Sequence, residues 1–243
     1  MNLSTLGSTG DAVSMDSTNW TARAAGLVYA VNIVTGIFSL LYVPSHIIVH
    51  GDASATFNNI VATESLFRLG IVAGVISHLA FLILPLILYK LLNPVNKGMA
   101  VLMVALAVVA VPIDIVAIAN QLDALTLLHE PISQPAFPAD QIHSRVLASL
   151  AAYHNRLLIA QFFWGLWLLP FGYLVFKSGF LPRFLGIFLM LGCLSYLISF
   201  FIDTLFPQYD VPGFVMLPAS IGEIGIALWL TILGARKSLL VGK

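Results

Sequence analysis

Six apolar stretches, each long enough to cross a lipid bilayer, constrain this chain more than any other feature. A helix needs about 20 consecutive, mainly apolar residues to span the hydrocarbon core of a membrane. Stretches of this length lie at residues 24–49, 67–91, 98–120, 156–177, 182–204 and 214–235. Only 9% of the residues are charged, whereas a typical soluble domain has about a quarter. The sequence therefore predicts an all-α polytopic membrane protein with six transmembrane helices.

The basic residues predict which ends of these helices face the cytoplasm. One group falls in alternate links and near the chain ends, and comprises Lys90, Lys97, Lys177, Lys237, Lys243, Arg23, Arg183 and Arg236. Only Arg68, Arg145 and Arg156 fall at the opposite ends of the spans. Because cytoplasmic loops are enriched in Lys and Arg, the distribution predicts that both termini are cytoplasmic.

The first residues differ from the rest of the chain. Residues 1–21 are rich in Ser, Thr, Gly and Asp, with neither a basic start nor the short apolar run of a signal peptide. This composition predicts a disordered cytoplasmic tail. A single six-helix transmembrane domain is expected at residues 22–238.

The two longer links on the predicted external side carry helix signals of their own. Asp52 suits the N-cap of a short helix at 53–66, which would lie on the second span or lead into it. Residues 129–138 contain three prolines and predict a loop. From Ala139 a helix is expected to restart and to form an outward extension of the fourth span.

Composition and motifs exclude several classes of function. The 11 basic and 11 acidic residues balance, so no basic surface for nucleic acid is expected. Cys193 is the single cysteine and cannot form an intramolecular disulfide or a cysteine-based zinc site. The chain contains no Gly-rich phosphate loop and no G-x-S-x-G nucleophile elbow.

Three ionisable residues lie deep in the predicted spans. Glu223 is near the middle of the sixth span, Asp114 lies in the third after Pro112, and His78 lies in the second beside Ser77. A charged side chain at the centre of a membrane helix costs about 2.5–3.5 kcal/mol on insertion scales. Each therefore calls for a partner or a role. The acids are either protonated groups hydrogen-bonded between helices or direct participants in function.

Most other intramembrane polar residues gather in the predicted outer half, and the inner half is mostly Leu, Ile, Val and Phe. This distribution predicts a polar cavity that opens to the outside and is closed below by apolar packing. The candidates for ligand binding or proton titration are Asp114, Glu223, His78, His154, Arg156, Gln161 and Gln121.

A metal site is an alternative use of some of these residues, although the main interpretation includes no metal or cofactor. The ligand types suit zinc or iron, and the candidates are His46, His78, His154, Asp114 and Glu223. No H-E-x-x-H motif is present, so the ligands would have to converge from separate helices.

Gly70 and Gly74 have the small-xxx-small spacing that lets two helices approach closely. Packing within the chain is the main expectation, and a homodimer through this face is the alternative.

Several sequence strings resemble a bacterial multipass membrane family catalogued as domain of unknown function 4386. They are YVPSHIIVHGDASATFNNI, LYKLLNPVNKGMAVLMV, FWGLWLLPFGYLVFKSGFLPRFLGI and the closing GEIGIALWL. The resemblance covers about residues 22–236. It implies one domain in the bacterial cytoplasmic (inner) membrane, and it assigns no activity and no role to any residue.

Three functional readings stay open. The first is a protein that binds or transports a small or amphiphilic molecule through the outward cavity. The second is an integral-membrane enzyme, metal-dependent or not, that acts on a lipid or lipophilic substrate from the outer leaflet by acid–base chemistry. The third is a structural or regulatory membrane subunit whose buried polar groups only specify helix packing.

Overall fold

A computed structural model describes residues 4–129 and 139–235, with side chains described from Thr18 and, after the gap, from Gln141. Within these ranges the regular structure is entirely helical. The elements are α1 Ser4–Ile37, η1 Phe38–Tyr42 (a π-helical turn), α2 Val43–Ile47, α3 Ala53–Ala62, α4 Glu64–Leu92, α5 Lys97–Leu128, α6 Ala139–Leu166, α7 Leu168–Lys177, α8 Arg183–Leu205, η2 Gly213–Met216 (a 3-10 turn) and α9 Leu217–Ile232.

Six helical segments of the described chain are long and apolar enough to cross a membrane, which confirms the prediction of a six-span all-α protein. They are Thr18–Ile47, Glu64–Leu92, Lys97–Leu128, Gln141–Lys177, Arg183–Leu205 and Gly213–Ile232. Which ends face the cytoplasm stays a prediction.

The smaller predicted elements are present. The short helix before the second span is α3, and the Asp52 side chain accepts a hydrogen bond from the Ala55 amide at 2.8 Å as its N-cap. The extension of the fourth span is the first part of α6, which begins at Ala139. Of the predicted loop at 129–138, only His129 lies within the described residues.

The structure describes the backbone of most of the N-terminal segment as helical. Helix α1 begins at Ser4, residues 1–3 lie outside the described residues, and the disordered tail at 1–21 stays a prediction. The first proline of the chain is Pro44, so no residue before it removes a backbone donor from the helical hydrogen-bond ladder.

The chain divides into two compact units. Unit 1 comprises Met1–Ala30, Phe81–Val108 and Phe162–Lys243, and unit 2 comprises Val31–Ala80 and Val109–Gln161. Helices α1, α4, α5 and α6 each contribute to both units. The prediction of one domain at 22–238 stays a prediction.

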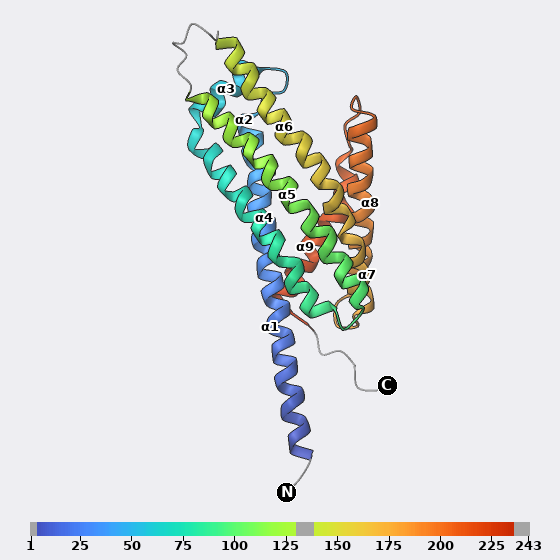
Figure 1. Cartoon of the computed structure of the whole chain (residues 1–243). Coiled ribbons are helices and arrows are strands. Elements are labelled where there is room, and N and C mark those ends of the chain that lie inside the picture. Colours follow the sequence, from blue (N-terminus) through green and yellow to red (C-terminus); the bar gives the residue numbers. More distant parts are fainter. Residues whose placement is uncertain (1–3, 130–138, 236–243) are drawn as a thin grey trace. The chain divides into compact units, whose positions relative to one another are not determined.

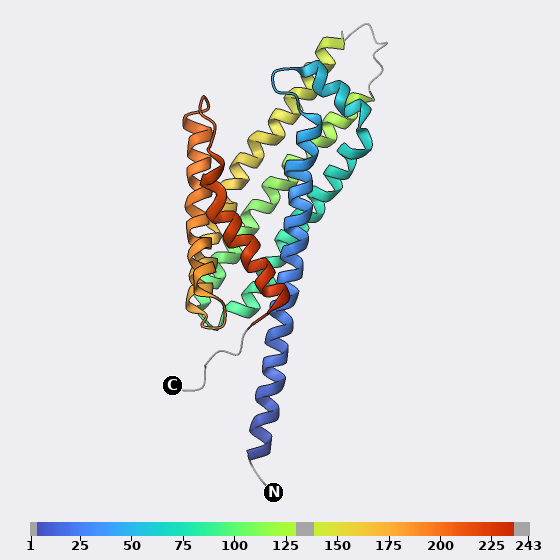
Figure 2. The same ribbon diagram turned by 180° about the vertical axis from the view of Figure 1, so that it is seen from behind.

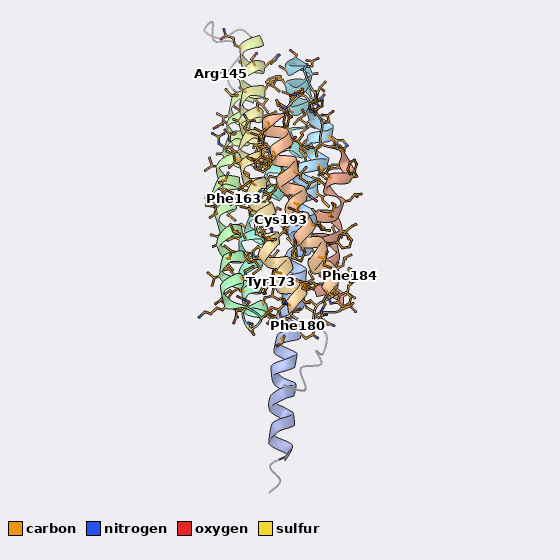
Figure 3. The ribbon with its side chains drawn as sticks, turned by 90° about the vertical axis from the view of Figure 1, so that its right-hand side faces the viewer. Arg145, Phe163, Tyr173, Phe180, Phe184 and Cys193 are labelled. Carbon is orange, nitrogen blue, oxygen red and sulfur yellow. The ribbon has the colours of Figure 1, made fainter. Side chains whose placement is uncertain are left out.

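In unit 1, α7 packs against α8, and α8 packs against α9 (Figures 1 and 2). Phe180 and Phe184 mark the region where the chain turns from α7 into α8, and Cys193 lies further along α8 (Figure 3). The links α4–α5 and α7–α8 and the end of α9 all lie at one end of this unit.

Trp167, at the junction of α6 and α7, is the centre of an aromatic cluster in unit 1. Its ring centroid is 5.2 Å from those of Phe81 and Phe171 and 6.1 Å from that of Tyr29. Trp167 is only 1% exposed. Because aromatic rings bury large areas and prefer tilted or offset contacts, this cluster joins α1, α4 and α7.

In unit 2, polar contacts reinforce an apolar core. Asn32 on α1 donates to the Ser77 carbonyl on α4 at 3.0 Å, and the Ser77 hydroxyl donates to the Asn32 carbonyl at 3.0 Å. The Asn59 side chain on α3 donates to the Ile47 carbonyl at 3.1 Å. The core residues include Val43, Ile47, Phe57, Ile60, Phe67, Ile71, Ile118, Leu125, Ile142, Val146 and Leu150.

Candidate functional site

His78 on α4 and Asp114 on α5 form a buried pair in unit 2. His78 Nε2 and Asp114 Oδ1 are 3.4 Å apart, and the two side chains are 5% and 0% exposed. The other ring nitrogen, Nδ1, lies 2.6 Å from the Gly74 carbonyl oxygen, one turn earlier on α4. Because a carbonyl oxygen only accepts hydrogen bonds, Nδ1 carries a proton and donates it.

The 3.4 Å approach of Nε2 to the carboxyl is favourable in two arrangements of protons. An imidazole protonated only at Nδ1 presents a lone pair at Nε2, which attracts a carboxylic acid and repels a carboxylate. The contact is therefore attractive either between imidazolium and carboxylate or between imidazole and carboxylic acid, and both forms hold the same number of protons. Two of the candidate residues thus form a unit that can hold or pass on one proton.

A polar hollow of about 480 Å³ lies between α5 and α6 in unit 2. Its lining residues are Asn120, Asp123, Thr126, Leu127, Arg145, Ala148, Ser149 and Ala152. Five of these eight residues have polar side chains, including one acid and one guanidinium. Arg145 projects from α6 near its N-terminal end (Figure 3). The volume falls in the range of about 300–1,000 Å³ that is typical of small-molecule sites.

The candidate residue Arg156 borders the polar hollow. Its Nη1 donates to Asn120 Oδ1 at 2.8 Å and to the Ala152 carbonyl at 3.2 Å, and both acceptor residues line the hollow. The Asn120 amide in turn donates to the Val116 and Ala117 carbonyls at 3.1 and 3.0 Å. Asn120 thereby holds the guanidinium at the edge of the hollow.

Two other candidates, Gln121 and His154, line a second pocket in unit 2. This pocket has a volume of about 130 Å³, and Tyr153 also contributes to its wall. We call it the apolar pocket because its other lining residues are Leu40, Val43, Pro44, Ile47, Ile48, Phe67, Leu150 and Leu157. Gln121 is buried and His154 is exposed. The candidate Gln161 is half-buried on α6 and lines neither the hollow nor this pocket.

Glu223, the remaining candidate, belongs to unit 1 and is held by two tyrosines. Tyr29 on α1 donates to Glu223 Oε2 at 2.8 Å, and Tyr196 on α8 donates to Oε1 at 3.0 Å. Each carboxyl oxygen therefore has its own phenol donor, and the three side chains join α1, α8 and α9. This geometry fits the reading of Glu223 as a hydrogen-bonded link between helices.

Tyr29 and Tyr196 were not among the candidate residues predicted from the sequence. A signal was available, because tyrosine in membrane proteins concentrates at the bilayer interface, whereas both residues lie inside apolar spans. A buried tyrosine hydroxyl usually finds a hydrogen-bond partner. Glu223 is an acid in the same kind of environment, so the three could have been proposed as partners.

The part of the chain that the structure describes contains no set of side chains that supports the alternative of a zinc or iron site. No three His, Cys, Asp or Glu side chains come together there in a way that could hold a metal ion. His46 Nδ1 lies 2.8 Å from the Tyr42 carbonyl oxygen within its own helical segment. Glu223 belongs to unit 1, whereas His78, Asp114 and His154 belong to unit 2.

Gly70 and Gly74 face other helices of unit 2. A Cβ atom at Gly70 would lie 2.9 Å from Val43 Cγ1, and one at Gly74 would lie 3.6 Å from Ile118 Cδ1. The close approach at Gly70 is thus used within the chain. A homodimer through this face stays a prediction.

Six apolar spans with polar groups buried between them define an α-helical, multipass integral membrane protein. The chain belongs to the family described as "Domain of unknown function (DUF4386)", which matches residues 24–234. It is also similar to an uncharacterized protein from Archaeoglobus fulgidus, with 28% identity over 154 residues, covering 62% of this chain and 75% of that protein. No solved structure matches the chain. Since that relative is archaeal, the bacterial inner membrane stays a prediction for this chain.

Proposed function

We propose that this membrane protein binds a small or amphiphilic molecule in unit 2, in the polar hollow between α5 and α6. The observation that carries the proposal is a space of about 480 Å³ lined mainly by polar side chains, within helices that are otherwise apolar enough to cross a membrane. On the predicted topology this space opens toward the outside.

The lining indicates what kind of molecule would fit. Arg145 offers a guanidinium for an anionic or strongly accepting group, and Asp123 offers a carboxylate for a cationic or donating group. Thr126 and Ser149 add hydroxyls that both donate and accept. A zwitterionic or hydroxyl-bearing molecule, including an amphiphile with such a headgroup, matches this set better than a purely apolar ligand.

Filling the hollow tests the proposal. Ala148 lines the hollow and is exposed, whereas Ala151 is exposed on the same helix and does not line it. We expect wild type and the Ala151→Trp variant to carry the same small molecule through purification in a mild detergent, and Ala148→Trp to lose it. Native mass spectrometry with identification of the released molecule makes this measurement. Equal occupancy in all three proteins would refute the hollow as the binding site.

Proton-coupled transport of the bound molecule is a second candidate, favoured by the His78–Asp114 pair. A buried pair that shares one proton in a membrane span has the chemistry of a proton relay. Uptake of the identified molecule into proteoliposomes under an imposed proton gradient tests this reading. Asp114→Asn should remove the dependence on the gradient, and uptake that follows the gradient equally in both proteins would contradict it.

A further inference from the structure

The apolar pocket of unit 2 contains one polar side chain with an unusual environment. Gln121 lines this pocket from α5 and is only 7% exposed, and the rest of the lining is apolar apart from Tyr153 and the exposed His154. Its amide makes no hydrogen bond to any other residue that the structure describes. The polar atoms of the amide are not fully enclosed by protein, so they remain accessible to a molecule in the pocket.

The side-chain amide of Asn120, one residue earlier on α5, shows that this part of the helix can provide hydrogen-bond partners for an amide. Asn120 donates to two backbone carbonyls of its own helix and accepts from Arg156 at 2.8 Å. Gln121, one residue later, points to the other pocket and has none of these partners. Gln121 therefore lacks such partners because it faces the apolar pocket, and not because of its position on the helix.

We infer that the apolar pocket binds an apolar chain carrying one uncharged hydrogen-bonding oxygen, to which the Gln121 amide donates. No Asp, Glu, Lys or Arg lines the pocket, so a charged group would enter without a counter-charge, which is costly in a low-dielectric site. A hydroxyl or a carbonyl needs only the donor and acceptor that one amide supplies.

The size of the pocket fixes how much of such a molecule it takes. Its volume is about 130 Å³, and an apolar cavity of about 150 Å³ is known to admit benzene. The pocket therefore holds a short segment beside the oxygen, and the rest of the chain extends past the exposed His154. The ester segment of a membrane lipid and the hydroxyl end of a free long-chain alcohol share this chemistry. This inference is independent of the polar hollow.

Photolabelling of the full-length protein in nanodiscs tests the inference. The probe is decanol with a diazirine in its chain, and the matched probe is the same diazirine alkane without the hydroxyl. In nanodiscs of diether phospholipid, which has no ester carbonyl, we expect the alcohol to label peptides of α2 and α6 saturably, and the alkane to label them weakly. Gln121→Leu keeps the side-chain size and removes the amide, so it should weaken labelling by the alcohol roughly three- to tenfold, the effect of one neutral hydrogen bond.

Two further variants keep the result interpretable. His154→Trp places an indole at the exposed rim and should abolish labelling even if Gln121→Leu folds poorly. Asn155→Leu changes an exposed amide on α6 that lines neither pocket and should label like wild type.

The lipid composition distinguishes the two sources of the ligand. If nanodiscs of diester phospholipid suppress labelling by the alcohol, the membrane lipid occupies the pocket, and if labelling is equal in both lipids, a free lipophilic alcohol does. Both results support the inference. Equal labelling by the alcohol and the alkane, or labelling that Gln121→Leu leaves unchanged, would overturn it.

Discussion

At the scale of single residues, the His78–Asp114 pair carries the most demanding polar chemistry in unit 2. Both side chains are almost fully buried, and the hydrogen bond from Nδ1 to the Gly74 carbonyl fixes the orientation of the imidazole ring. The pair stays attractive only while it retains the shared proton. Loss of either side chain should therefore reduce the stability of the protein by more than a single 3.4 Å contact would suggest.

We predict that the two partners of this pair respond differently to substitution. His78→Phe leaves the Asp114 carboxyl buried without its imidazole and should cost about 3–5 kcal/mol of stability. Asp114→Asn should cost only about 1 kcal/mol, because the new amide can donate to the Nε2 lone pair. Thermal unfolding in one detergent, followed by loss of helical circular dichroism, makes the comparison.

A double variant provides the control for this prediction. His78→Phe combined with Asp114→Leu removes both polar groups, so its destabilisation should be smaller than the sum of the two single changes. Additive effects would show that the two side chains do not act as a pair.

For single residues, the sequence predicted that some candidates need a partner, but it did not predict which residue the partner is. Burial costs predicted that Glu223, Asp114 and His78 each need a partner or a role, and the structure gives each of them one. The identity of the partner depends on which helices are neighbours, and spacing along one helix contains no such information. Tyr29 and Glu223 are separated by 194 residues in the chain yet form a 2.8 Å hydrogen bond.

At the scale of helices, α7 and α8 approach each other through glycine. A Cβ atom at Gly172 would lie 2.6 Å from the Gly186 carbonyl oxygen, and one at Gly186 would lie 2.7 Å from the Gly172 carbonyl oxygen. The obstructing atoms belong to the backbone and cannot rotate away. Small residues at such positions let membrane helices come close enough for extensive van der Waals contact.

Gly172→Ala should therefore destabilise the protein by about 1–3 kcal/mol, the usual cost of overpacking a tight contact. Gly98→Ala is the matched control, because Gly98 is also helical and a Cβ atom there would meet only Asn96 Oδ1 at 3.5 Å. Thermal unfolding of the two variants beside wild type checks this difference. Equal stability of the two variants would mean that the α7–α8 interface relaxes around the added methyl group.

Helix ends were less predictable than helix positions. Hydropathy placed the third span at 98–120, but α5 continues to Leu128 because backbone hydrogen bonding does not stop where polar side chains begin. The fourth span passes from α6 to α7 at Trp167, whose backbone stays in the right-handed helical region. Pro170 lies in the first turn of α7, where its missing donor costs little, so a new helix start here suits the sequence.

At the scale of the whole molecule, the contacts divide the candidate residues in a way that the sequence could not show. Six of the seven lie in unit 2, and Glu223 lies in unit 1. Sequence position suggested one common outer cavity, because distance along each span was the only available measure of depth. The structure describes two pockets within unit 2 and a hydrogen-bonded triad within unit 1, and the common outer cavity stays a prediction.

The positions of the basic residues predict the orientation of the chain in the membrane. In unit 1 the links α4–α5 and α7–α8 lie at one end (Figure 1), and Lys90, Lys97 and Lys177 lie in the helix ends that flank these links. Because basic residues near span ends are retained in the cytoplasm, this end should be cytoplasmic. Helix α3 joins the first span to the second and the α4–α5 link joins the second to the third, so α3 should be external. Single cysteines placed in a Cys193→Ala background should therefore differ in access to a membrane-impermeant maleimide. Ser54→Cys, on α3, should react in intact cells, whereas Lys97→Cys should react only after the membrane is permeabilised. Both native residues are exposed, so neither result depends on burial. The reverse labelling pattern would show that the charge distribution does not set the topology of this protein.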